Sequence, residues 1–149
     1  MNSRLHALAP NLIELGKDLD PEKRGAMARR VAGWACEKTD ADSYLGKERL
    51  SQLLCGSNTL SDEARSQLEH DVEMLDEKYF IAQSEDGDGA DSSDGLEWFS
   101  KARAVSSLMY ALESKSLDAF CEALYEAHAA TDDLHALLQI CQRLLGETG

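Results

Sequence analysis

The chain has 149 residues, of which 43% are hydrophobic, and its 15 Lys and Arg against 28 Asp and Glu give a net charge of −13. This length and apolar content argue against disorder of the whole chain, and residues 1–149 are expected to form a single domain. The negative charge argues against bare nucleic-acid and membrane-phosphate partners, because such binders cluster Lys and Arg. No apolar run reaches the ~20 residues that cross a bilayer, and the N-terminus lacks a secretory signal pattern, so we expect a cytoplasmic protein.

The first part of the chain contains both prolines and predicts three helices, because its apolar residues recur with a period near 3.6. A first helix is expected over residues 3–16, started late or bent by Pro10. Asp20 as N-cap and Pro21 as first helical residue begin a second helix. Its inward side is expected to carry Met27, Val31 and Trp34. A shorter third helix is expected to stop at Gly56.

The chain continues with a long helix and one polar segment. Ser61 can cap a fourth helix that runs to about Ala82. A flexible acidic loop rich in Gly, Ser and Asp is expected over residues 83–95. Asp94 and Glu97 then form a candidate capping box for a fifth helix.

Two more helices complete the pattern. Ser116 can cap the sixth, and the last is expected to begin near Asp132 and to end at Gly146. About six to seven helices with short connections predict a compact all-α domain, orthogonal or bundle-like in its packing.

The four cysteines lie far apart and form no C-x-x-C pair; they are Cys36, Cys55, Cys121 and Cys141. This spacing favours free, buried thiols in a reducing compartment over disulfides. It also offers no clustered thiolates for zinc.

The negative charge belongs to the second part of the chain. Residues 1–60 hold nine Lys and Arg and eight Asp and Glu (9 − 8 = +1), whereas residues 61–149 hold six and twenty (6 − 20 = −14). At 100° per residue, Asp62, Glu69, Glu73 and Asp76 fall within about 60° of one another on the fourth helix, with Glu77 at the margin. The sixth helix carries Asp118, Glu122 and Glu126 at spacings of four. The loop adds Glu85, Asp86, Asp88, Asp91 and Asp94.

These acidic strips have two interpretations. They are either ordinary solvated faces or a docking surface that steers a cationic protein partner into contact. A mixed Glu and Lys face would keep the protein equally soluble without like-charge repulsion along the helix, which favours docking. Tyr79, Phe80 and Trp98 are candidate apolar anchors near the ends of the loop, although core positions would explain them as well. The predicted partner-binding set is Asp62, Glu69, Glu73, Asp76, Glu77, Asp86, Asp88, Asp91, Asp94, Trp98, Glu122 and Glu126.

Catalytic and metal-binding signatures were sought and not found in the sequence. Residues 86–97 have carboxylates near the spacing of an EF-hand calcium loop, but Asp91 replaces the glycine of the sharp turn and Ala90 offers no side-chain oxygen. Weak binding of divalent ions stays open. No histidine pairs with another at i+4, and no phosphate loop or nucleophile elbow is present. We expect no enzyme activity, no metal and no cofactor, with an enzyme built from dispersed residues as the alternative.

A small basic cluster stands apart from the acidic pattern. Arg24, Arg29 and Arg30 lie beside Trp34 on the second helix. Nucleic-acid binding would need more positive charge and exposed aromatic residues. An internal contact with an acidic strip, with Trp34 in the core, is the expected explanation.

Residues 96–133, with Glu97-Trp98-Phe99 and the helical segment 102–112, resemble the small acidic all-helical immunity proteins of bacterial contact-dependent and secretion-delivered toxin systems. The resemblance implies a binding protein, monomeric or homodimeric, that occludes a cognate toxin, often a basic nuclease. An acidic secretion chaperone or adaptor, which keeps an effector soluble, is the alternative. A metal-responsive module centred on the loop is a third hypothesis.

Overall fold

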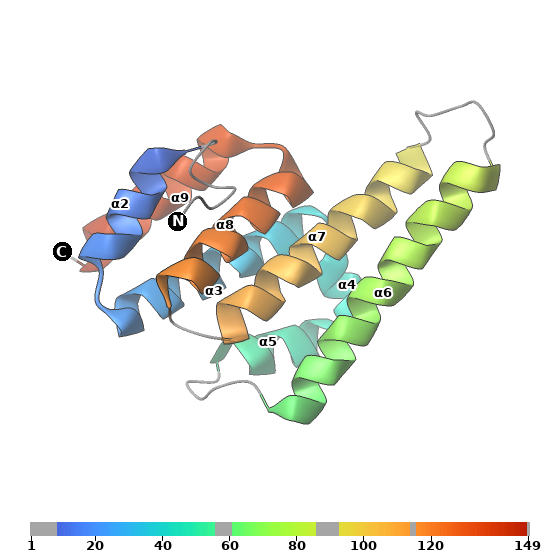
Figure 1. Ribbon diagram of the computed structural model, residues 1–149, viewed down its shortest axis with the longest axis horizontal. Coiled ribbons are helices and arrows are strands. Elements are labelled where there is room, and N and C mark those ends of the chain that lie inside the picture. Colours follow the sequence, from blue (N-terminus) through green and yellow to red (C-terminus); the bar gives the residue numbers. More distant parts are fainter. Residues whose placement is uncertain (1–8, 56–60, 86–92, 114–115, 149) are drawn as a thin grey trace.

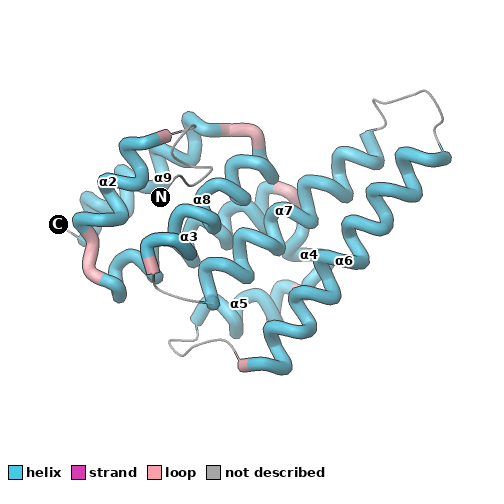
Figure 2. Tube along the Cα trace, in the orientation of Figure 1, coloured by secondary structure: helices cyan, strands magenta, loops and turns pink. Residues whose placement is uncertain are grey.

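The computed structural model describes residues 9–55, 61–85, 93–113 and 116–148, and this part of the chain is helical without strands. The all-α prediction is therefore confirmed. These ranges form eight helices, where six to seven were expected, and loops and turns connect them (Figure 2). They are α2 (Pro10–Asp18), α3 (Pro21–Lys38), α4 (Ala41–Leu45), α5 (Lys47–Cys55), α6 (Asp62–Glu85), α7 (Ser93–Glu113), α8 (Leu117–Thr131) and α9 (Leu134–Thr148).

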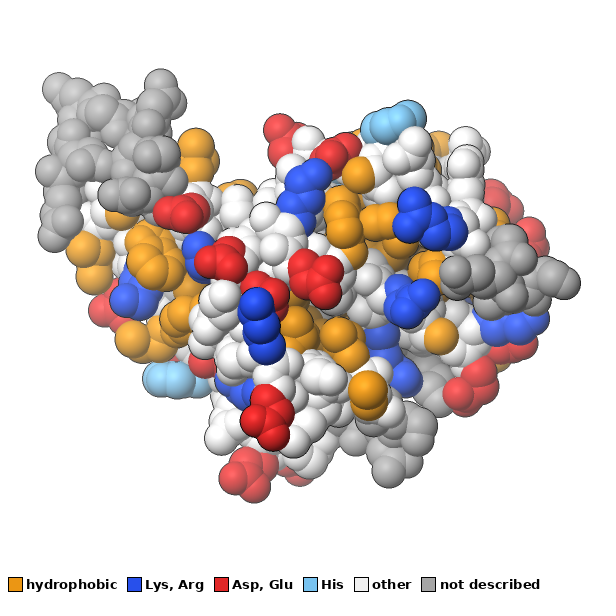
Figure 3. Space-filling view, turned by 180° about the vertical axis from the view of Figure 1, so that it is seen from behind, with side chains coloured by type: hydrophobic (Ala, Val, Ile, Leu, Met, Phe, Trp, Pro, Cys, Tyr) orange, Lys and Arg blue, Asp and Glu red, His pale blue; other side chains and the backbone are white. Residues whose placement is uncertain are grey.

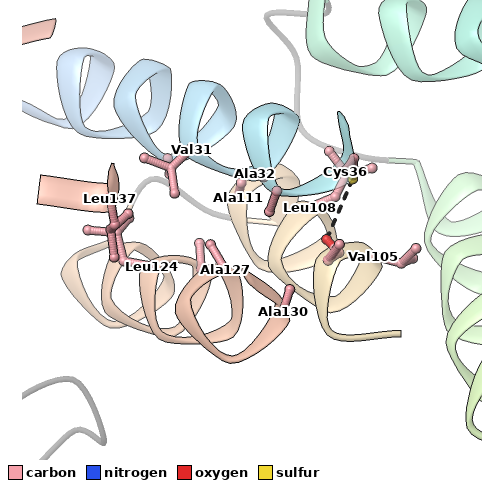
Figure 4. Packing of buried hydrophobic residues seen from close by; sticks show 14 of the residues in the cluster. Val31, Ala32, Cys36, Val105, Leu108, Ala111, Leu124, Ala127, Ala130 and Leu137 are labelled. Carbon is pink, nitrogen blue, oxygen red and sulfur yellow. Dashed lines mark hydrogen bonds between the residues drawn. The ribbon is translucent and has the colours of Figure 1, made fainter. Parts of the chain in front are cut away.

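The core lies where α3, α7 and α8 pack on one another. Small side chains on all three helices let the backbones approach closely, and Val31, Leu108 and Leu124 fill the space between them (Figure 4). The Cys36 thiol lies 3.7 Å from the carbonyl oxygen of Ala104, which joins α3 to α7 inside this core.

The remaining helices surround this centre. α2 packs on α8, α9 packs on α3 and α8, and α4 packs on α3 and α7. α6 packs mainly on α7, and the outer half of the α6–α7 hairpin extends beyond the other helices (Figure 1). Lys38 at the end of α3 donates to Asp133 at 2.8 Å, and this hydrogen bond lowers the pKa of the Asp133 carboxyl below its usual range.

Three of the predicted helix starts rest on local capping and are confirmed, those of α3, α6 and α8. The Asp20 carboxylate accepts from the Lys23 amide at 2.9 Å, and Pro21 is the first residue of α3. The Ser61 and Ser116 hydroxyl oxygens accept from backbone amides three residues on, at 3.2 and 3.1 Å. Local sequence therefore determines where these three helices begin.

Several boundaries in the first half differ from the prediction. α2 begins at Pro10, whose ring suits the first helical turn, while residues 1–8 lie outside the described ranges. The expected third helix is divided into α4 and α5 by Gly46, which adopts φ 95°, a conformation that glycine allows.

The boundaries of the second half differ as well. α6 continues to Glu85 and α7 begins at Ser93, so both ends of the expected 83–95 loop are helical and Asp94 lies inside the first turn of α7. α9 begins at Leu134, near Asp132 as expected, and the Asp133 carboxylate caps it by accepting from the Ala136 amide at 3.0 Å. α9 then continues through Gly146 to Thr148.

The four cysteines are free, as expected, but they are not all buried. Cys36, Cys121 and Cys141 are buried, whereas Cys55 at the end of α5 is exposed. Desolvation raises the pKa of both Cys36 and Cys141 to about 12.

Across the described ranges, none of the helices has the length and apolar character needed to cross a bilayer.

Candidate functional site

The outward face of α6 carries the strip of carboxylates that the sequence predicted. Leu68 and Leu75 are fully buried on the side that packs against α7. The acidic side chains on the opposite side are exposed, namely Asp62, Glu63, Glu69, Glu73 and Glu77. The helical periodicity of α6 therefore separates an apolar face from an acidic face.

Arginines of the chain itself neutralise part of this strip. Arg65 contacts Glu69 at 3.2 Å and also reaches Glu113 of α7 at 2.8 Å. Asp76, which is only half exposed, pairs with Arg103 of α7 at 3.4 Å. Within the described ranges, three carboxylates of the strip have no ion-pair partner: Asp62, Glu73 and Glu77. No neighbouring cation in the described part of the chain neutralises the negative charge of this part of the strip.

The carboxylates of α8, the sixth expected helix, do not form an exposed strip. The prediction that Glu126 belongs to an exposed partner-binding surface is wrong. Glu126 is only 3% exposed and lies 3.3 Å from the Arg103 guanidinium. Glu122 is half-buried with contacts of its own, and Asp118 alone is exposed. The cause is tertiary, because α8 has α2, α3, α7 and α9 packed around it. The many alanines of α8 could have indicated from the sequence that other helices enclose it on most sides.

The predicted acidic loop falls largely outside the described residues. This holds for Asp86, Asp88 and Asp91, and the side chain of Asp94 is likewise not described. The calcium hypothesis for residues 86–97 therefore stays untested. Within the described ranges, His, Cys, Asp and Glu form no group of three or more that could hold a metal ion.

Large apolar side chains are exposed near the end of the α6–α7 hairpin. Phe80 is 65% exposed, Ile81 49% and Leu96 53%. Phe80 and Ile81 stand near the end of α6 and Leu96 near the start of α7, so all three lie at the projecting end of the hairpin (Figure 1). Hydrophobic side chains gather at this end of the face in Figure 3. The sequence analysis did not identify Ile81 and Leu96 as exposed apolar anchors. Ile81 could have been identified, because it falls outside the apolar stripe of α6.

The other candidate anchors are partly occupied within the hairpin. Tyr79 is half-buried, with ring centroids 5.6 Å from Phe80 and 5.5 Å from Phe99. Trp98 is half-buried, and the ammonium groups of Lys78 and Lys101 lie 5.0 and 5.3 Å from its ring centroid. The contacts of Tyr79 with Phe99 and of Lys78 with Trp98 join α6 to α7. Phe80 is therefore the candidate ring that stays available for a partner.

The basic cluster of α3 contacts the end of α2 through Arg24. The Arg24 guanidinium donates to the carbonyl oxygens of Gly16 and Leu19 at 2.9 and 3.2 Å, which satisfies the end of α2. Arg29 and Arg30 line a hollow on the outer face of α3. Trp34, expected in the core, is half-buried and lines the same hollow.

Comparison with known proteins gives no relative for this chain, because no family model, no curated protein and no solved structure matches it.

Proposed function

We propose that this protein binds a basic partner protein through the end of the α6–α7 hairpin and thereby neutralises it, as an immunity protein does with its cognate toxin. The observation that carries the proposal is the exposure of Phe80, Ile81 and Leu96 at the end of a hairpin whose Glu73 and Glu77 carboxylates have no ion-pair partner among the described residues. The surface so defined, called here the hairpin surface, consists of these five residues.

The hairpin surface combines the two features that a protein-binding site needs. Apolar side chains that are exposed together are typical of interaction sites, because burying them in a complex removes apolar area from water. Carboxylates around them raise the rate of encounter with a positively charged protein and disfavour acidic competitors. At 100° per residue, Glu73, Glu77 and Phe80 lie within about 60° of one another on α6, so one partner can contact all three.

The hairpin is also held rigid before binding. Arg65 joins α6 to Glu113 at one end of the hairpin, and Arg103 joins α7 to Asp76 further along. The ring contact between Tyr79 and Phe99 links the two helices nearer the projecting end. A rigid surface loses little conformational entropy on binding, which favours a tight complex.

The proposal is tested first through charge. The tagged chain is used to recover its partner from the source organism at low salt, and association with the purified partner is then measured. We expect Glu73→Lys with Glu77→Lys to slow association at least tenfold at low salt and far less at high salt. Glu48→Lys with Asp118→Lys changes the net charge equally at exposed sites outside the hairpin and is the matched control.

The second test concerns the apolar anchor. Phe80→Ala should speed dissociation by roughly 30-fold, the effect of losing about 2 kcal/mol at an interface hot spot. Because Phe80 is mostly exposed, the variant should keep the melting temperature of the parent chain. Unchanged association of the charge-reversed chain together with unchanged dissociation of Phe80→Ala would refute the hairpin surface as the binding site.

The secretion chaperone or adaptor is the second candidate, because exposed apolar side chains at the hairpin surface would also suit an unfolded client or a second copy of the chain. Light scattering of the purified chain, and titration with a reduced, permanently unfolded protein, separate the two. Immunity function predicts one-to-one binding of a folded partner and no binding of the unfolded chain. A homodimer that binds the unfolded protein through Phe80 would favour the chaperone.

A further inference from the structure

The outer face of α3 forms the floor of a hollow of about 530 Å³ that lies apart from the hairpin surface. Residues at spacings of three and four on α3 line it, because such residues share one face of a helix. α5 and α9 supply its walls. Its lining includes Ala26, Arg29, Gly33, Trp34, Leu54 and Arg143.

Small residues on α3 create the space. Gly33 carries no side chain, and a Cβ there would lie 3.1 Å from a methyl group of Leu54, so Leu54 rests directly on the helix. Ala26 is exposed and borders both this hollow and a second one of about 370 Å³ that continues along α3. The two together offer a concave surface of the size that small ligands occupy.

The hollow is cationic, although the protein as a whole carries a net charge of −13. Arg29, Arg30 and Arg143 line it, and Glu37 is its one carboxylate among the lining residues. Figure 3 shows Lys and Arg side chains gathered over the half of this face that lies away from the hairpin end. Guanidinium groups that line one hollow favour an anion bound there.

One donor in this group lacks an acceptor. The Nε atom of Arg29 is buried and makes no hydrogen bond within the described structure. A buried donor without an acceptor is unfavourable by roughly 1–3 kcal/mol, so a change of the Arg29 rotamer that brings Nε to an acceptor in the hollow would be favourable. Arg24, one turn earlier on α3, shows the contrast, because its Nε donates to the Gly16 carbonyl oxygen at 2.9 Å.

We propose that this hollow binds a small organic oxyanion, that is, a carboxylate or phosphate group joined to an apolar or aromatic body. The planar guanidinium groups of Arg29 and Arg143 match the paired oxygens of either anion. The Trp34 ring, Leu54 and Ile140 offer the apolar surface that the body of the ligand covers. A nucleic-acid strand does not fit, because it needs cations along an extended track and the surface beyond the hollow is negative overall.

Trp34 gives a direct signal for binding. Trp34 and Trp98 are the two tryptophans of the chain, so Trp98→Phe leaves Trp34 as its single indole fluorophore. In this variant we expect saturable quenching by phenyl phosphate and by benzoate. The affinity should exceed that of inorganic phosphate and of benzyl alcohol by at least tenfold, because each of those probes offers only one half of the recognised chemistry. Phenyl phosphate and benzoate share the phenyl ring and differ in the anionic group and its attachment, so their comparison tells a phosphate-bearing from a carboxylate-bearing ligand.

Substitutions in the hollow then locate the site. Arg29→Gln and Arg143→Gln should each weaken phenyl phosphate binding about tenfold, the effect of losing one charge-assisted hydrogen bond. Ala26→Glu should abolish binding without disturbing the fold, since Ala26 is exposed. Lys47→Gln removes an exposed cation from α5, outside the lining, and should leave binding unchanged.

The proposal is overturned by three outcomes. These are no saturable response to either aromatic anion at millimolar concentration, equal affinity for inorganic phosphate, and equal loss of affinity in Lys47→Gln and Arg29→Gln. Ala26→Glu keeps the test informative if Arg29→Gln is unstable.

Discussion

At the scale of single residues, Arg103 has the most consequential contacts. Its guanidinium lies between the buried carboxylate of Glu126 and the half-exposed carboxylate of Asp76, at 3.3 and 3.4 Å. One cation therefore connects α6, α7 and α8. Helical periodicity alone would place the carboxylates of Glu126 and Asp76 on the acidic surface. Their pairing with Arg103 removes them from it.

This arrangement predicts unequal effects of removing the partners. Arg103→Met should lower the free energy of unfolding by about 3 kcal/mol, because it leaves the Glu126 charge buried without its guanidinium partner. Glu126→Gln should lower it by only about 1 kcal/mol, since the amide keeps the shape and Arg103 retains Asp76. Urea unfolding of both variants checks the order, and a smaller loss for Arg103→Met would contradict it.

The cysteines lead to a second prediction at this scale. Burial raises the pKa of Cys36 and Cys141 to about 12, so at pH 8 their reactive thiolate forms are nearly absent and reagent access is closed. Cys55 is exposed. A chromogenic disulfide reagent at pH 8 should therefore label one thiol of the native chain rapidly and all four in denaturant.

Cys55→Ser should remove the rapid phase of this labelling. A second rapidly labelled thiol in the native protein would show that the core opens on the time scale of the reaction.

At the scale of elements, the packing of α2 on α8 depends on a missing side chain. Gly16 is buried in α2, and a Cβ there would lie 2.7 Å from the Phe120 ring and 2.9 Å from Leu117. Phe120 is almost fully buried and has little room to move. Gly16 thus sets the separation of the two helices, although glycine is a poor helix former in general.

We expect Gly16→Ala to lower the free energy of unfolding by about 1–3 kcal/mol, because overpacking outweighs the better helix propensity of alanine. Gly33→Ala is the matched control. There the new methyl group would meet only the end of the Leu54 side chain at 3.1 Å, and Leu54 is half exposed and can move. Thermal unfolding should show a clear loss for Gly16→Ala and a near-neutral effect for Gly33→Ala; equal effects would contradict the packing argument.

At the scale of the whole molecule, charge is distributed in two regions. Exposed carboxylates face outward from α6, while arginines of α3 and α9 line one hollow. The two proposed sites are therefore opposite in charge. The negative hairpin surface suits a basic protein, and the positive hollow on α3 suits an organic anion.

The net charge of −13 implies repulsion within the folded chain. Added sodium chloride should raise the melting temperature at neutral pH, because screening weakens this repulsion more than it weakens the few buried ion pairs. The charge-reversed Glu73→Lys, Glu77→Lys chain should show a smaller rise. A melting temperature that falls with salt would mean that attractive ion pairs dominate.

Much of the fold could be predicted from local signals. The caps at Asp20, Ser61 and Ser116 begin their helices as expected, because capping involves only the first helical turn. The break at Gly46 was not predicted, and neither was the continuation of α9 through Gly146. A glycine can end, divide or continue a helix, and its neighbours in space decide which occurs.

For the candidate site, periodicity predicted the outward orientation of Glu73 and Glu77 but not the burial of Glu126. Sequence by itself determined the helical class, the starts of α3, α6 and α8 and the excess of carboxylates, because these follow from composition and from contacts within one turn. The tertiary structure alone decided which carboxylates meet Arg103, which apolar residues the hairpin leaves exposed and which arginines share a hollow. Each of these depends on helices that are distant in the chain lying side by side, and a one-dimensional pattern does not contain that proximity.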